Sequence, residues 1–299
     1  MRKAFLFVLL AYLCAALCGA TAFAEAAETA MTPEELCEAG ADACDAEDYD
    51  RALEYYRAAA DLGFAKAWRG IGSLYFNGFG VEQSYEKARE YWQLAADQGD
   101  DQAIYNLGYL YGGGFGVEQS FEKAREYYLQ AAELGNANAM SVVGNMYFYG
   151  EGGEQSYEKA LEYWLLAADE GLAGGQYNVG LAYAAGYGVE QSFEKAAEYW
   201  LPAAEQGNPF AMEGLGCLYA EGNGVEQSAE KALEYLQQAA DLGAAGAFVD
   251  LGELYENGLG VEQSYAKAAE YYRLAAEQGI QEAAEALNRL AEEGHIQEK

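Results

Sequence analysis

Histidine and recognised catalytic motifs are almost absent from this sequence. His295 is the only histidine and stands close to the C-terminus. Its isolation argues against histidine-assisted nucleophiles and histidine-based metal sites. The sequence has no Cys-x-x-Cys pair and no Gly-x4-Gly-Lys-Ser/Thr loop for nucleotide phosphates. We therefore predict no catalytic residue, no metal ligand and no cofactor, and interpret the chain as a protein that is not an enzyme.

Positive charge is also scarce. The 299 residues include 17 lysines and arginines against 49 acidic residues, a net charge of −32. That balance argues against nucleic-acid and anionic-membrane partners, because both are bound through cations. Basic proteins and divalent cations are the partners that remain, and a simple solubility coat is the alternative. Acid clusters such as Asp100-Asp101 lack the alternating spacing of a calcium loop.

Cysteine is too sparse for a disulfide framework. Of five cysteines, Cys14 and Cys18 lie in the N-terminal segment, so three remain: Cys37, Cys44 and Cys217. Cys37 and Cys44 are seven residues apart, about 10.5 Å along a continuous helix. That separation exceeds the Cα reach of a disulfide. We interpret all three as small packing residues.

Long apolar runs are confined to the N-terminus. Arg2 and Lys3 precede the apolar stretch 4–17, and Ala22-Phe23-Ala24 offers a small-x-small cleavage site before Glu25. This order predicts a secretory signal peptide over residues 1–24, with an uncleaved membrane anchor as the alternative. Removing the two cations of this segment takes the net charge to −34. We expect an exported protein, periplasmic or secreted, that is monomeric and not inserted in the membrane after cleavage.

A 36-residue repeat dominates the remainder of the sequence. The motif Gly-Val-Glu-Gln-Ser or a close variant begins at Gly80, Gly116, Gly152, Gly188, Gly224 and Gly260. Tyrosine, glycine and alanine columns keep the same register. A fixed period of this length indicates a repeat architecture, in which stacked helical pairs share one core.

One repeat, residues 100–135, can be interpreted physically. Ala103, Leu107 and Leu110 lie on one face of a first helix that ends in a glycine run. Ser120 is a good N-cap for a second helix, which ends at Gly135. The pattern predicts six such units over residues 64–279. Residues 25–63 are interpreted as an N-terminal capping helical pair, and 280–299 as a capping helix and tail.

These columns resemble the Sel1-like repeat family, a branch of the tetratricopeptide-like solenoids. In the second unit the pattern is carried by Ala103, Leu107, Gly108, Tyr111, Gly114, Gly116, Val117, Phe121, Ala124, Tyr127, Tyr128, Ala131, Ala132 and Gly135. The resemblance implies an all-α fold, a right-handed α/α superhelical solenoid. It also implies an adaptor that binds a protein or peptide, and the acidity of the chain suggests that this partner is basic. The alternative is weak β-lactam binding or hydrolysis, as in the cysteine-rich branch of the family, although alanine stands here at the regular small positions. A purely structural or cation-buffering acidic protein is a further alternative.

Solenoids of this kind bind ligands in a concave groove lined by the first helix of each pair. The groove positions vary from unit to unit, whereas the packing columns do not. Aromatic and amide side chains there suit an extended peptide, and acids suit its basic end. The alternative is that these rings pack on their own neighbours and leave the groove empty. The predicted partner-binding residues are Tyr105, Tyr109, Asn138, Asn145, Phe148, Tyr149, Tyr177, Glu213 and Glu253.

A Ser-x-x-Lys tetrapeptide begins the second helix of all six units, at Ser84, Ser120, Ser156, Ser192, Ser228 and Ser264. Serine β-lactamases carry this motif together with Ser-Asp-Asn and Lys-Thr-Gly. Neither partner motif occurs. Six copies at one helix start favour serine N-caps over a nucleophile.

Overall fold

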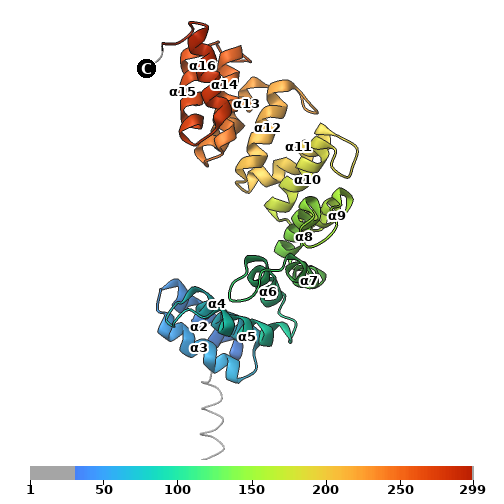
Figure 1. Ribbon diagram of the computed structural model, residues 1–299, viewed down its shortest axis with the longest axis vertical. Helices are drawn as coiled ribbons and strands as arrows, with labels where there is room; N and C mark the ends of the chain where they lie inside the picture. The colour runs from blue at the N-terminus through green and yellow to red at the C-terminus, as the bar shows by residue number, and fades with distance from the viewer. Residues whose placement is uncertain (1–30, 298–299) are drawn as a thin grey trace, which may run out of the picture. The chain divides into compact units, whose positions relative to one another are not determined.

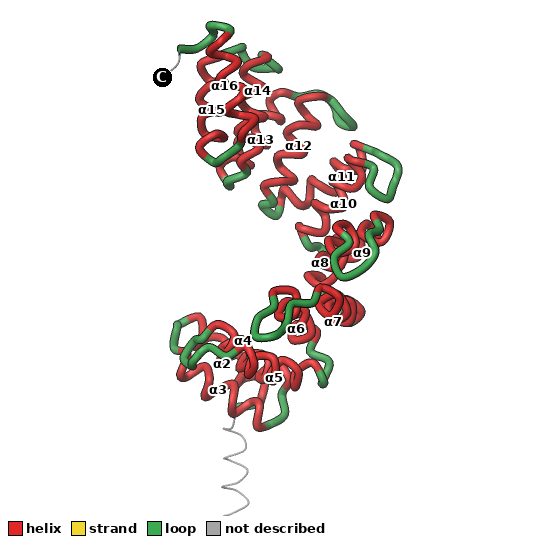
Figure 2. Tube along the Cα trace, viewed as in Figure 1, coloured by secondary structure: helices red, strands yellow, loops and turns green. Residues whose placement is uncertain are grey.

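The computed structural model describes residues 31–297, and the predicted signal segment lies outside them. The described residues form α-helices joined by loops, without a strand (Figures 1 and 2). None of these helices combines the length and apolar character that crossing a membrane requires. The helices are α2 (Pro33–Asp45), α3 (Tyr49–Asp61), α4 (Ala65–Asn77), α5 (Tyr85–Ala96), α6 (Asp101–Gly113), α7 (Phe121–Glu133), α8 (Ala137–Tyr149), α9 (Tyr157–Asp169), α10 (Ala173–Ala185), α11 (Phe193–Glu205), α12 (Pro209–Glu221), α13 (Ala229–Asp241), α14 (Ala245–Asn257), α15 (Tyr265–Glu277) and α16 (Gln281–Glu292).

Within each unit, helices that follow one another in the chain pack together. We call the even-numbered helices A helices and the odd-numbered ones B helices. Helix α4 packs on α5 in the first unit, and α8 packs on α9, α9 on α10 and α10 on α11 in the second. Two compact units result. One runs to Leu110 and includes Phe115–Val117, and the other holds Tyr111–Gly114 and Glu118 onward. The predicted all-α solenoid class is confirmed.

The Gly-Val-Glu-Gln-Ser motif closes one helix and opens the next. In the pair α10–α11, the Gln191 side-chain Nε2 donates to the carbonyl of Ala184, 2.7 Å away, at the open end of α10. The Ser192 hydroxyl accepts from the backbone N–H of Lys195 at 3.3 Å and so caps α11. The Ser192 N–H in turn donates to the Tyr183 carbonyl. The motif therefore satisfies backbone groups that helix ends leave without partners.

The motif's glycine is required where the loop crosses the preceding pair. Gly188 has φ +68°, and a Cβ there would lie 2.6 Å from the backbone of Tyr157 at the start of α9. Only a residue without a side chain tolerates both the left-handed backbone and this close approach.

Tyrosines fill the space between the two helices of a pair. The two tyrosine columns stack on each other, as Tyr183 does on Tyr199 with ring centroids 5.9 Å apart. The motif lysine covers the outer face of the stack, and the Lys195 ammonium lies 4.8 Å from the Tyr183 ring centre. The same arrangement recurs from Tyr75–Tyr91 to Tyr255–Tyr271. Aromatic stacking and cation–π contacts therefore fix the geometry of each pair.

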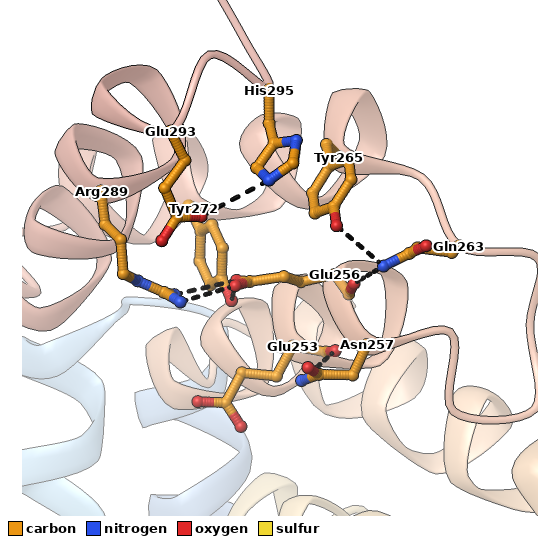
Figure 3. A network of polar contacts seen from close by, with 9 residues as sticks. All are labelled: Glu253, Glu256, Asn257, Gln263, Tyr265, Tyr272, Arg289, Glu293 and His295. Carbon is orange, nitrogen blue, oxygen red and sulfur yellow. Dashed lines mark hydrogen bonds and ion pairs between the residues drawn. The ribbon is translucent and has the colours of Figure 1, made fainter.

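Helices α2 and α16 stand at the two ends of the described residues. Helix α2 begins with a capping box between Thr32 and Glu35 and runs unbroken past Cys37 and Cys44. Both cysteines are free, as is Cys217. At the other end, α16 packs on α15. Arg289 of α16 also reaches the Glu256 carboxylate of α14 (Figure 3).

Candidate functional site

A continuous line of side chains crosses the A helices of the second unit. We call it the A-helix strip and define it by Tyr149 (α8), Tyr177 (α10), Phe210 and Glu213 (α12), and Asp250 and Glu253 (α14). These residues differ from repeat to repeat, whereas the packing columns beneath them do not. Variable side chains on an invariant scaffold are typical of a recognition surface.

The first half of the strip is aromatic and open to solvent. The side chains of Tyr149 and Phe210 are 69% and 55% exposed. Tyr177 lies between them, half-buried, with its ring centre 5.8 Å from that of Phe210. Burial raises the pKa of Tyr177, and the nearby Glu213 and Tyr149 add to the shift. Large exposed rings of this kind are the side chains that most often anchor a partner protein.

The second half of the strip is acidic and partly desolvated. The Cys217 thiol donates to the Asp250 carboxylate across 3.4 Å, joining α12 to α14. Burial, with Glu213 second, raises the pKa of Asp250 to about 7. Burial also raises the pKa of Glu213 and, together with Glu282 and Glu256, that of Glu253. Three carboxyl groups therefore lie where their charged forms are disfavoured, and a cation brought to them would relieve this cost.

We expect the second unit to lose stability as pH rises from 4 to 8. Asp250 has a folded-state pKa of about 7, against 3.8 for an ordinary aspartate. Protonated Asp250 is thus favoured by folding, and its contribution is complete below the unfolded pKa and lost as pH rises through the folded one. Asp250→Asn should remove this loss and stabilise the unit at pH 8 by about 1–3 kcal/mol.

Urea unfolding of both proteins at pH 5 and pH 8 measures the difference. The matched control is Asp169→Asn, an exposed position at the end of α9. Equal pH dependence in the Asp250→Asn protein and the unsubstituted chain would contradict the assignment.

The structure brings several of the predicted residues together on α8. Asn138, Asn145 and Tyr149 lie at i, i+7 and i+11, on one side of the helix. Asn138 is exposed. The Asn145 side-chain oxygen accepts from the Trp164 indole at 3.0 Å and from Asn178 of α10 at 3.2 Å. Asn145 therefore ties adjacent A helices together and keeps only its amide nitrogen for a ligand.

Phe148 is packed by its own neighbours. Its ring lies 5.1–5.4 Å from the rings of Tyr157, Trp164 and Tyr187, and it is half-buried. Phe148 therefore packs on its own neighbours, as the alternative interpretation of the groove residues expects. We regard Phe148 as support for the strip.

Tyr105 and Tyr109 belong to the first unit, on α6, and are described with it. Tyr109 is exposed and its ring lies 5.9 Å from that of Phe76 and 5.4 Å from that of Phe115. Tyr105 is half-buried, and burial raises its pKa. The first unit therefore also carries predicted aromatic residues on an A helix, α6.

Sequence reasoning missed Asp250 and did not select Phe210. Asp250 directly precedes the Leu251-Gly252 packing pair, a register position that was not assigned to the groove. The signal was present, because the same position is uncharged in the other five units: Gly70, Asn106, Val142, Asn178 and Gly214.

The Ser-x-x-Lys serines are helix caps in all six copies. Each hydroxyl accepts from the backbone N–H of the motif lysine at 3.2–3.3 Å. Each lysine ammonium lies 4.6–5.2 Å from the centre of a tyrosine ring. The sequence interpretation proposed the serine caps, and the structure adds the cation–π contacts of the lysines.

Comparison with known proteins supports the helical-repeat fold. A family model described as "Sel1 repeat" matches seven segments of the chain. The first of them, 35–64, falls in the region that the sequence analysis interprets as a capping helical pair with only part of the repeat pattern. The matched segments are 35–64, 67–100, 101–136, 137–172, 173–208, 209–243 and 249–280. No curated protein matches the chain.

The crystal structures to which the chain is similar include the following two. One is c5321, a protective antigen present in uropathogenic Escherichia coli strains displaying an SLR fold. It shares 30% identity and a TM-score of 0.79 over 92% of this chain, which spans 60% of that protein's length. The other is a Sel1 repeat protein from Oxalobacter formigenes, with 30% identity, a TM-score of 0.71, and coverage of 80% of this chain and 96% of that one.

Proposed function

The chain belongs to the Sel1 repeat family, and on this premise we propose that it is a scaffold that binds another protein along the A-helix strip. The Sel1 repeat fold commonly mediates protein–protein interaction. The partner segment that suits the strip is an extended one, apolar where it meets Tyr149 and Phe210 and basic where it meets Asp250 and Glu253.

One observation carries this proposal. Exposed rings and partly desolvated carboxyl groups follow one another without a break over α8, α10, α12 and α14. Tyr177 contacts Phe210, the pKa of Tyr177 responds to both Tyr149 and Glu213, and Glu213 acts on Asp250. Large rings, left exposed beside acids that form no ion pair with any described residue, offer both the anchors and the charge complementarity that protein recognition uses.

Export is part of the same proposal. The N-terminal segment 1–24 has the order of a secretory signal peptide. The partner would then be a protein of the cell envelope or of the medium, and basic, because the chain itself is strongly acidic. The experiment therefore uses the chain from Glu25 onward.

We expect the double variant Tyr149→Ala, Phe210→Ala to weaken partner binding at least about tenfold, because it removes two exposed anchors. Partners captured from envelope and supernatant proteins would be identified and purified. Their dissociation constants with the native chain and the variant would then be measured by calorimetry.

The control variant is Leu134→Ala, Leu242→Ala. These leucines are 55% and 56% exposed, like Phe210, but lie at the ends of B helices. An equal loss of affinity in the control, or none in the test variant, would show that the strip is not the binding surface.

A further inference from the structure

A separate cleft lies in the first unit, between α2 and α4. Its volume is about 580 Å³, within the range of small-molecule sites. Helix α2 contributes one wall and α4 the other, while α3 supplies the floor. The lining includes Glu34, Glu38, Ala41, Tyr56, Lys66 and Arg69.

The two walls carry opposite charge at one end of the cleft. Glu34 and Glu38 stand on the first turns of α2, and Lys66 and Arg69 on the first turns of α4. Within the described part of the chain, no ion pair joins the two walls. Arg69 instead pairs with Asp100 at 3.4 Å. Exposed acids thus face cations across open space.

The thiols of the cleft add no charge to this arrangement. Burial raises the pKa of Cys37, which lies near Arg69 and Lys66, and likewise raises the pKa of Cys44. Both are therefore neutral at pH 7. The charges that remain in the cleft are the carboxylates of Glu34 and Glu38, the Lys66 ammonium, and the Arg69 guanidinium that Asp100 already pairs.

The other end of the cleft is aromatic. Tyr49 and Phe79 stack there with ring centres 4.6 Å apart. The floor between the two ends is the Tyr56 ring, held between Gly40 of α2 and Gly70 of α4. A Cβ on Gly40 or Gly70 would lie 2.7–2.8 Å from that ring, so only glycine admits it. The cleft therefore runs from a charged end to an apolar one.

We propose that this cleft binds a free α-amino acid with a large apolar side chain. Its ammonium would face Glu34 and Glu38, and its carboxylate would face Lys66 and Arg69. An α-amino acid carries its ammonium and its carboxylate on the same carbon. It can therefore place one charge against each wall at the charged end of the cleft. The side chain would then lie over Tyr56 toward Tyr49 and Phe79. This site is independent of the A-helix strip and of its partner.

The experiment is calorimetric titration of the whole chain with four probes: L-phenylalanine, N-acetyl-phenylalanine, phenylalanine amide and glycine. We expect saturable binding of phenylalanine. Each of the other probes lacks one element of recognition, the ammonium, the carboxylate or the apolar side chain, and should bind at least about tenfold more weakly.

Variants locate the site. Lys66→Ala should weaken phenylalanine about tenfold and leave phenylalanine amide unchanged, since the amide has no carboxylate to lose. Ala41→Phe adds a ring at an exposed lining position and should abolish binding. Arg57→Ala, at an exposed position on α3 outside the lining, is the charge-matched control and should bind as the native chain does.

Three results would overturn the proposal. The first is no saturable binding of phenylalanine, and the second is equal binding of phenylalanine and its amide. The third is binding that survives Ala41→Phe in a protein whose circular dichroism matches the native chain. None of these outcomes depends on the A-helix strip, because the probes and variants touch only the first unit.

Discussion

Replacing Arg289 with alanine is expected to release the C-terminal helix α16 and destabilise its attachment by about 2–3 kcal/mol. The Glu256 carboxylate is held by three bonds (Figure 3). Arg289 approaches it with Nη1 at 2.8 Å and Nη2 at 3.1 Å, and the Tyr272 hydroxyl donates to it at 2.7 Å.

The expected loss of stability is large because one partner of the ion pair, Glu256, is buried, although the other, Arg289, is exposed. The Glu256 side chain is 10% exposed and that of Arg289 is 52% exposed. Removing the cation leaves a buried carboxylate with the tyrosine as its remaining donor, which costs more than an exposed ion pair would. Because repeats depend on their neighbours, the loss should appear at α16 before it appears elsewhere.

Amide hydrogen exchange measures this locally. Protection of the α16 amides should fall roughly 30- to 150-fold, which corresponds to the expected free energy of about 2–3 kcal/mol. Arg273→Ala on α15 is the control, since Arg273 forms no ion pair with the described residues. Adding Glu256→Gln to Arg289→Ala should restore part of the protection. Unchanged exchange in the Arg289→Ala protein would mean that the bond network does not hold the helix.

Gly180→Ala is expected to destabilise the second unit by about 1–3 kcal/mol, although alanine favours helix more than glycine does. A Cβ at Gly180 would overlap the Trp200 indole. Trp200 is 6% exposed, and its indole N–H donates to the Tyr177 carbonyl at 3.0 Å. The ring has little room to move, so packing outweighs propensity.

Gly174→Ala on the same helix is the matched control, because it should not destabilise the second unit. Apart from its own helix, the nearest described atom to a Cβ at Gly174 is the Ser141 hydroxyl oxygen, at 4.0 Å. There the substitution should be neutral or stabilise by up to about 0.5 kcal/mol. Urea unfolding of the two variants, followed by far-ultraviolet circular dichroism, compares them. If both changes had the same sign, close packing of Gly180 on Trp200 of α11 would not be what fixes the geometry of this pair.

The repeat made the fold predictable. Apolar residues at i, i+4 and i+7 indicate each A helix, and Ser120 and its counterparts mark the start of each B helix; the structure agrees in both respects. These signals are local, because helix periodicity and capping act within a few residues. The candidate site was predicted only in part. The repeat register correctly placed Tyr149, Tyr177 and Glu213 on A helices. It could not show that the Tyr149 side chain is exposed whereas that of its neighbour Phe148 packs against other rings.

The sequence by itself determined the family, the helical pairs, the caps and the continuity of α2 past Cys37 and Cys44, since all of these follow from short-range patterns repeated at a fixed interval. The tertiary structure decided which side chains meet across neighbouring pairs. Asn145 bonds to Asn178, and Cys217 to Asp250, each 33 residues apart. The cleft beside Tyr56 likewise depends on Gly40 and Gly70, which lie on two different helices and both approach the Tyr56 ring closely. Such contacts depend on the spacing and rotation between stacked helices, which packing of the whole core sets and no local pattern encodes.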